Sequence, residues 1–164
     1  LEILVGLGNG FTVEQKERAL VVGGGVGVPP LYRLCKELLQ RGTKVDVILG
    51  FNTSDECFYE EEFKQLGASV TVCTVDGTQG IKGFVSEAIQ DDLKNIDYYS
   101  CGPLPMLKAV FDSSNAKGQL SFEERMGCGF GACMGCSCKT LTGYKRICVE
   151  GPIMKSEEIL WTKD

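Results

Sequence analysis

Five of the nine cysteines in this 164-residue chain lie between positions 128 and 148, and this cluster restricts the possible fold more than any other feature. Cys128, Cys133 and Cys136 follow the spacing C-x4-C-x2-C, and Cys148 comes later, beyond a gap. The four thiolates of a plant-type 2Fe-2S site occur in this order along a chain. The spacing therefore predicts that these four cysteines ligate a 2Fe-2S cluster.

The residues around these cysteines suit a small anionic centre. Glycines stand in and beside the ligand run at 127, 129, 131 and 135, where a loop must wrap closely and turn backbone N–H groups toward sulfur. Residues 125–148 contain four basic side chains and no Asp or Glu. A 2Fe-2S core with four thiolates carries a formal charge of about −2 when oxidised, so a cationic segment favours the cluster.

Three alternatives to an iron-sulfur cluster stay open: a zinc site with four cysteine ligands, a disulfide framework and plain buried thiols. Zinc sites usually pair two short-spaced cysteine knuckles, whereas Cys148 stands alone. Disulfide frameworks are typical of secreted proteins, whereas this chain lacks the pattern of a signal peptide. Cys138 is a spare thiol, which could replace Cys136 or Cys148 only with a different loop geometry. The chain has no histidine, which excludes Ser-His-Asp and Cys-His catalytic groupings, His-ligated zinc and Rieske centres.

Composition restricts the partners and the location of the chain. The net charge of -5 argues against a nucleic-acid-binding surface, and the longest uncharged run, 19–32, is too short and too rich in Gly and Pro to span a bilayer. The chain opens without an initiator Met and without the pattern of a signal peptide. We therefore expect a cytoplasmic protein without a membrane segment, preceded by further sequence.

Short apolar runs alternate with helical patterns over 19–114. The expected strands are 19–22, 44–49, 70–75 and 97–100, with a further candidate at 118–125. One expected helix begins after Pro29-Pro30. Three further helices are expected at 55–66, at 84–89 and in the region of 106–110. This alternation predicts an α/β fold, in which an open, mostly parallel sheet has helices on both faces. The pattern ends near residue 118, where a small Cys-rich domain is expected to begin.

A glycine turn follows the first expected strand. Gly23, Gly24, Gly25 and Gly27 stand between that strand and a helix, where backbone N–H groups could meet a pyrophosphate. The strict G-x-G-x-x-G pattern fails, so a tight strand-helix turn without a ligand is the alternative. Residues 51–63, which follow the second expected strand, contain no Lys or Arg to meet a 2′-phosphate, and this favours NAD over NADP.

These motifs together resemble one family. The sequence runs from the glycine turn through Cys101-Gly102-Pro103-Leu104-Pro105-Met106 to residues 123–136, with the letters EERMGCGFGACMGC, and ends in CVEGP at 148–152. It resembles the electron-transfer subunits of type B dihydroorotate dehydrogenase, in the ferredoxin-reductase group, over nearly the whole chain. The resemblance implies a remnant of an FAD-binding β-barrel at 1–18, an NAD-binding α/β domain at 19–117 and a 2Fe-2S domain at 118–164, with the rest of the barrel missing.

The resemblance also implies roles and partners. NAD would lie across the glycine turn with its nicotinamide near Cys101 and Gly102, so that Cys101 is the candidate catalytic contact. Electrons from dihydroorotate, oxidised on a separate FMN-containing subunit, would pass through the cluster and FAD to NAD in pyrimidine synthesis. The alternatives are a related NAD(P)H-linked reductase subunit, serving ferredoxin, sulfide or hydrogenase partners, and a zinc-stabilised interaction module without redox activity.

Overall fold

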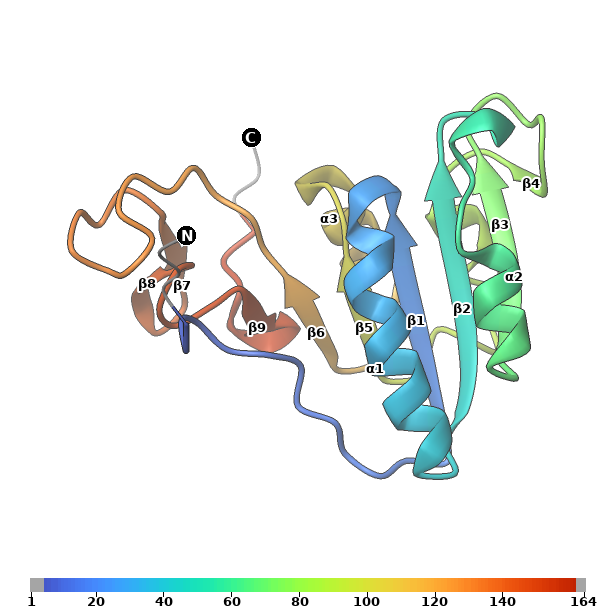
Figure 1. Cartoon of the computed structure of the whole chain (residues 1–164), viewed down its shortest axis with the longest axis horizontal. Coiled ribbons are helices and arrows are strands. Elements are labelled where there is room, and N and C mark those ends of the chain that lie inside the picture. The colour runs from blue at the N-terminus through green and yellow to red at the C-terminus, as the bar shows by residue number, and fades with distance from the viewer. Residues whose placement is uncertain (1–4, 162–164) are drawn as a thin grey trace.

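The computed structural model describes residues 5–161, in which a seven-stranded sheet has the order β4-β3-β2-β1-β5-β6-β9 (Figure 1). Neighbouring strands are parallel except for the β6–β9 pair, which is antiparallel. The strands are β1 (Arg18–Gly24), β2 (Lys44–Phe51), β3 (Ser69–Thr74), β4 (Ile81–Lys82), β5 (Tyr98–Cys101), β6 (Gly118–Ser121) and β9 (Ile153–Lys155). This is the open, mostly parallel sheet that the alternating pattern predicts.

Helices cover both faces of the sheet. The α-helices are α1 (Val28–Gln40), α2 (Glu60–Gln65) and α3 (Leu104–Ser113), and the 3-10 turns are η1 (Gly25–Gly27), η2 (Ser54–Glu56), η3 (Val85–Ala88) and η4 (Ser156–Glu158). Buried residues of α1 and α2 form one hydrophobic core with one face of the central strands. Those of α3 and η3 form a second core on the other face. The predicted fold class is therefore confirmed.

Two expected helices are shorter in the structure. The sequence pattern predicts one helix over 55–66, but η2 ends at Glu56 and α2 begins only at Glu60. Between them, Tyr59 has a positive φ of 68° and its ring packs edge-on against Tyr32. This aromatic packing breaks the helical path, because a residue in the left-handed conformation cannot continue a right-handed helix. Residues 84–89 form only the single turn η3.

The C-terminal segment packs against the edge of the sheet that lies beyond β5. A separate two-stranded sheet pairs β7 (Ser137–Thr140) with β8 (Gly143–Arg146), and β9 then joins the main sheet beside β6. Figure 1 shows the cysteine loop, in orange, at the end of the molecule away from β4. Ile147 and Met154 of this segment are fully buried in the same core as Leu107 of α3. The sequence pattern did not predict β7, β8 and β9.

The N-terminal connector is attached to this C-terminal segment through Asn9. Its backbone N–H donates to the carbonyl of Gly151 at 2.6 Å, and its side-chain amide donates to the carbonyls of Glu150 at 3.0 Å and Ile153 at 2.8 Å. The side-chain oxygen accepts the backbone N–H of Ile153 at 2.8 Å. Residues 5–17 form no helix or strand, and residues 1–4 of the expected barrel remnant lie outside the described part.

Within residues 5–161, no helix has both the length and the apolar character that a membrane-spanning helix requires.

Candidate functional site

Two of the predicted cluster ligands meet in the protein interior. The thiol of Cys136 lies 3.4 Å from the sulfur of Cys148, and both residues are buried. Cys136 comes directly before β7 and Cys148 shortly after β8, so the hairpin brings the two together. The backbone N–H of Ile147 donates to the carbonyl of Cys136 at 3.1 Å, which fixes the two ends of the hairpin next to each other.

The other two ligands sit in an exposed loop whose backbone turns toward sulfur. The N–H groups of Ala132 and Cys133 donate to the sulfur of Cys128 at 3.3 and 3.4 Å, and the N–H of Gly135 donates to the sulfur of Cys133 at 3.4 Å. This is the arrangement that the glycine content of the loop predicts. Backbone N–H groups directed at sulfur stabilise negative charge on it.

The same contacts favour a thiolate in each pair of cysteines. Backbone hydrogen bonds, first from Cys133 and then from Phe130, lower the pKa of Cys128 to about 6. The pKa of Cys136 is also lowered, chiefly by a backbone hydrogen bond from Cys148, whereas burial and the neighbouring Cys136 raise the pKa of Cys148. Metal ligation requires thiolates, so each pair already contains one cysteine suited to it.

Two separate pairs of cysteines suit a centre with two irons better than a single metal ion. Among the described residues, no three His, Cys, Asp or Glu side chains converge on one point as ligands of a single ion would. A zinc ion needs four ligands at one centre, whereas a 2Fe-2S cluster with four cysteine ligands has two irons, each of which can be held by one pair. The residues present fit the cluster, and Cys128 and Cys133 would hold one iron, Cys136 and Cys148 the other.

The remaining cysteines take no part in these pairs. Cys138 lies in β7 and its thiol approaches the carbonyl of Lys139 at 3.8 Å, and burial raises its pKa. Burial raises the pKa of Cys35 to about 12 and that of Cys73 to about 11. These thiols stay protonated at neutral pH, which agrees with their interpretation as core residues.

A second candidate site is a cavity of about 430 Å³ at the carboxyl ends of the parallel strands. Gly24 and Gly25 of the glycine turn line it. Because α1 begins at Val28 and continues with Pro29 and Pro30, which lack an N–H, its first turn offers few donors. A pyrophosphate here would therefore depend mainly on the N–H groups of the glycine turn itself.

The other predicted nucleotide residues, Gly23, Gly27, Cys101 and Gly102, are not part of the cavity lining. A side chain at Gly27 would place its Cβ only 2.3 Å from the carbonyl oxygen of Cys101 and 2.7 Å from the backbone nitrogen of Gly102. A Cβ at Gly23 would meet Leu31 at 2.9 Å. These glycines allow the turn, β5 and α1 to approach closely. Burial raises the pKa of the Cys101 thiol, which keeps it neutral.

Most residues that line the cavity were not found by sequence reasoning. Glu56 follows β2, and its carboxylate accepts hydrogen bonds from the backbone of Asn52 at 3.2 Å and from its side chain at 2.8 Å. The lining contains no Lys or Arg, which supports the preference for NAD that residues 51–63 suggest. The remaining lining residues are Gly50, Phe51, Val75, Gly83, Phe84, Val85, Ser86, Pro103, Pro105, Met106 and Ala109.

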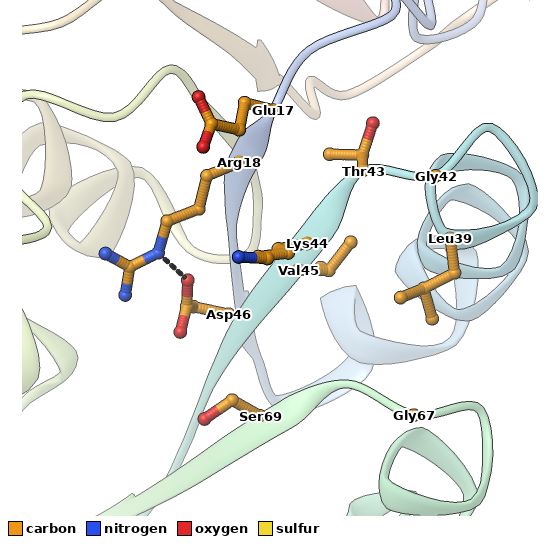
Figure 2. Close-up of a pocket in the computed structure, with 10 residues that line it drawn as sticks. All are labelled: Glu17, Arg18, Leu39, Gly42, Thr43, Lys44, Val45, Asp46, Gly67 and Ser69. Atoms are coloured by element: carbon orange, nitrogen blue, oxygen red, sulfur yellow. Dashed lines mark hydrogen bonds and ion pairs between the residues drawn. The ribbon is translucent and has the colours of Figure 1, made fainter.

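A larger hollow, of about 670 Å³, lies at the opposite, amino-terminal ends of the strands, where β1 and β2 begin (Figure 2). Figure 2 shows the guanidinium of Arg18 paired with Asp46, with a nitrogen–oxygen distance of 2.6 Å. Ligands of open α/β sheets bind at the carboxyl ends of the strands. The smaller cavity at the glycine turn is therefore the candidate nucleotide site.

Comparison with known proteins identifies the family of this fold. Residues 21–112, more than half of the chain, match the sequence profile of the oxidoreductase NAD-binding domain. The chain belongs to this oxidoreductase family. The matched segment covers the glycine turn, most of β1 and α3, and every residue that lines the nucleotide cavity.

The cysteine segment matches a second profile. Residues 123–160 match the iron-sulfur cluster binding domain of dihydroorotate dehydrogenase B. The electron transfer subunit of dihydroorotate dehydrogenase B (NAD(+)) from Lysinibacillus sphaericus is 51% identical over 93% of this chain, and the one from Fusobacterium nucleatum is 44% identical over 97%. The resemblance drawn from the motifs is confirmed. The chain spans 63% and 65% of the lengths of these two relatives.

Solved structures share the fold. An NADH-dependent reduced ferredoxin-NADP oxidoreductase, studied for flavin-based electron bifurcation, superimposes with a TM-score of 0.86 at 30% identity, over 98% of this chain and 60% of that one. The C-terminal domain of a hydrogenase from Pyrococcus furiosus superimposes with a TM-score of 0.54 at 17% identity, over 68% of this chain and 98% of that one. This second likeness concerns the fold alone.

Proposed function

We propose that this chain is the NAD- and cluster-binding part of an electron-transfer subunit of dihydroorotate dehydrogenase B. In this role it passes electrons from the FMN of a dihydroorotate-oxidising partner subunit, through a 2Fe-2S cluster and FAD, to NAD in cytoplasmic pyrimidine biosynthesis. The pairing of four cysteines beside an NAD-binding fold is the observation that carries the proposal. The names and identities of the relatives support it.

Each part of the chain has a distinct task in this proposal. Residues 19–117 bind NAD, with Gly24 and Gly25 next to the pyrophosphate and Cys101 and Gly102 near the nicotinamide. Residues 118–164 hold the cluster through the two cysteine pairs, and residues 1–18 correspond to the end of an FAD-binding barrel. When bound, the cluster supplies a one-electron centre and NAD accepts a hydride. Because the Cys101 thiol is neutral and does not line the cavity, Cys101 is not proposed as a nucleophile.

An anaerobic visible absorption spectrum of the purified chain, with iron, zinc and acid-labile sulfide assays on the same sample, tests the cluster. We expect about two irons and two sulfides per chain and an absorption that dithionite bleaches. Zinc without iron would contradict the proposal and support a structural zinc module. Copurification with an FMN-containing subunit that oxidises dihydroorotate would separate this function from that of a related ferredoxin, sulfide or hydrogenase reductase.

The cysteines provide a matched pair of variants. Cys133→Ser is expected to abolish cluster assembly, because it removes one ligand, while Cys138→Ser is expected to keep the full iron and sulfide content. Both variants should bind NAD with unchanged affinity, measured by calorimetry, because the nucleotide cavity lies in another part of the chain. Loss of the cluster in Cys138→Ser, with retention in Cys133→Ser, would overturn the ligand assignment.

A further inference from the structure

Arg146, at the end of β8, connects segments that carry different cluster ligands. Its Nη1 donates to the carbonyl of Gly131 at 2.9 Å, and Gly131 lies in the loop between Cys128 and Cys133. Its Nε donates to the carboxylate of Glu150 at 3.1 Å, and its Nη2 contacts the second oxygen of the same carboxylate. Glu150 stands just after Cys148, so one guanidinium holds both the exposed loop and the turn of the buried pair.

The backbone of Arg146 organises the same turn. Its carbonyl accepts the N–H groups of Val149 at 3.1 Å, Glu150 at 2.8 Å and Gly151 at 3.3 Å. Its own N–H donates to the carboxylate of Glu150 at 2.7 Å. The turn that carries Cys148 therefore closes around Arg146, which makes this residue a fixed point from which the side chain extends to the loop.

Gly131 is shaped for this contact. It has a positive φ of 91°, and a Cβ at this position would lie 2.6 Å from Val149 and 3.0 Å from Nη1 of Arg146. The loop thus fits closely between the guanidinium and Val149. A side chain here would displace the loop that bears Cys128 and Cys133.

The other basic side chains of the cysteine segment make no such contact. Lys145 pairs with Glu158 at 2.6 Å. Within residues 5–161, the side chains of Arg125 and Lys139 form no hydrogen bond or ion pair.

We propose that Arg146 is the positioning residue of the cluster site. It acts through the Gly131 carbonyl and the Glu150 carboxylate to hold the two cysteine pairs at a fixed separation, and its charge offsets that of the cluster and its thiolates. This inference rests on the proposed cluster-binding function. Reduction makes the site more negative by one charge. The positive charge of Arg146 therefore raises the midpoint potential, and the negative charge of Glu150 lowers it.

Two variants have opposite expected effects on this potential. Arg146→Met is expected to lower the midpoint potential in an EPR-monitored titration, because a cation is lost. Glu150→Gln is expected to raise it, because Arg146 is no longer neutralised. Arg146→Lys keeps the charge but cannot make all three contacts, so the potential should stay close to that of the unmodified chain while a chelator removes iron at least fivefold faster. Lys139→Met is the matched control, expected to change neither quantity.

The outcomes separate the inference from the function on which it rests. An unmodified chain without iron and sulfide would overturn both. If the chain holds its cluster but the midpoint potential shifts in the same direction in Arg146→Met and Glu150→Gln, the role of Arg146 alone is overturned. A structural disturbance would not depend on the sign of the charge removed, whereas an electrostatic effect would. Equal iron release from Arg146→Lys and the unmodified chain would also overturn it. Far-UV circular dichroism and NAD binding verify that each variant is folded.

Discussion

At the scale of single residues, Gly27 is the position where the glycine turn and the end of β5 come closest. A methyl group there would lie 2.3 Å from the carbonyl oxygen of Cys101, and backbone atoms cannot move aside cheaply. We expect Gly27→Ala to lower the free energy of unfolding by about 1 to 3 kcal/mol. Urea denaturation measures this loss. NAD affinity should fall as well, because the turn would be displaced.

Gly10→Ala is the control for this prediction. Gly10 has no positive φ, and a Cβ added to it would have no other atom within 4 Å, so its substitution should leave stability and NAD affinity unchanged. Equal stability of the Gly27 and Gly10 variants would show that the contact between the turn and β5 is loose.

The loop that carries three of the predicted cluster ligands could be recognised from sequence, because the cysteine spacing is a local constraint. Cys128, Cys133 and Cys136 lie within one loop, so local sequence already places them together. Arg146 could not be predicted, because its contact with Gly131 depends on how the β7–β8 hairpin folds back. Cys101 was correctly placed at the end of a strand, yet its side chain is absent from the cavity lining. Side-chain direction at a strand end depends on packing that the sequence pattern does not specify.

At the scale of elements, periodicity predicted the long strands and α1 but not the short pieces between them. The apolar runs of β1 and β2 and the spacing of the leucines in α1 are strong local signals. The strand β9 has only three residues and is defined by its antiparallel pairing with β6, far away in sequence. The break before α2 arises from tertiary packing of Tyr59. Both features depend on long-range contacts and therefore leave little local pattern.

The segment that follows β2 makes a prediction about nucleotide choice. Glu56 lines the cavity and its carboxylate is held by Asn52, so a 2′-phosphate bound at this end would meet a fixed negative charge. We expect Glu56→Gln to improve NADPH affinity relative to NADH by about fivefold, which corresponds to roughly 1 kcal/mol for one pair of charges. Fluorescence titration with both nucleotides measures the ratio.

Glu62→Gln serves as the control, because Glu62 is an exposed carboxylate on α2 outside the cavity. It should leave the ratio of the two affinities unchanged. An identical shift in both variants would mean that overall charge, rather than the position of Glu56, determines the preference.

At the scale of the whole molecule, the cysteine segment and the NAD-binding part share a hydrophobic core. Leu120 of β6 is fully buried in the core that also contains Cys136 and Cys148, whereas Leu38 of α1 is fully buried in the core on the opposite face. We expect Leu120→Ala and Leu38→Ala each to lower the free energy of unfolding by about 2 to 5 kcal/mol. The two variants differ in which neighbouring residues are disturbed by the space that the lost side chain leaves.

Only Leu120→Ala should also speed the loss of iron to a chelator, because relaxation around its cavity reaches the buried pair of cysteines. The experiment compares release rates under conditions where circular dichroism shows both variants fully folded, so that global unfolding does not contribute. If Leu38→Ala released iron as fast as Leu120→Ala, the effect would follow stability alone. If neither variant changed the rate, the cysteine segment would behave as an independent unit despite its shared core, and the sheet edge formed by β6 and β9 would serve only to attach it.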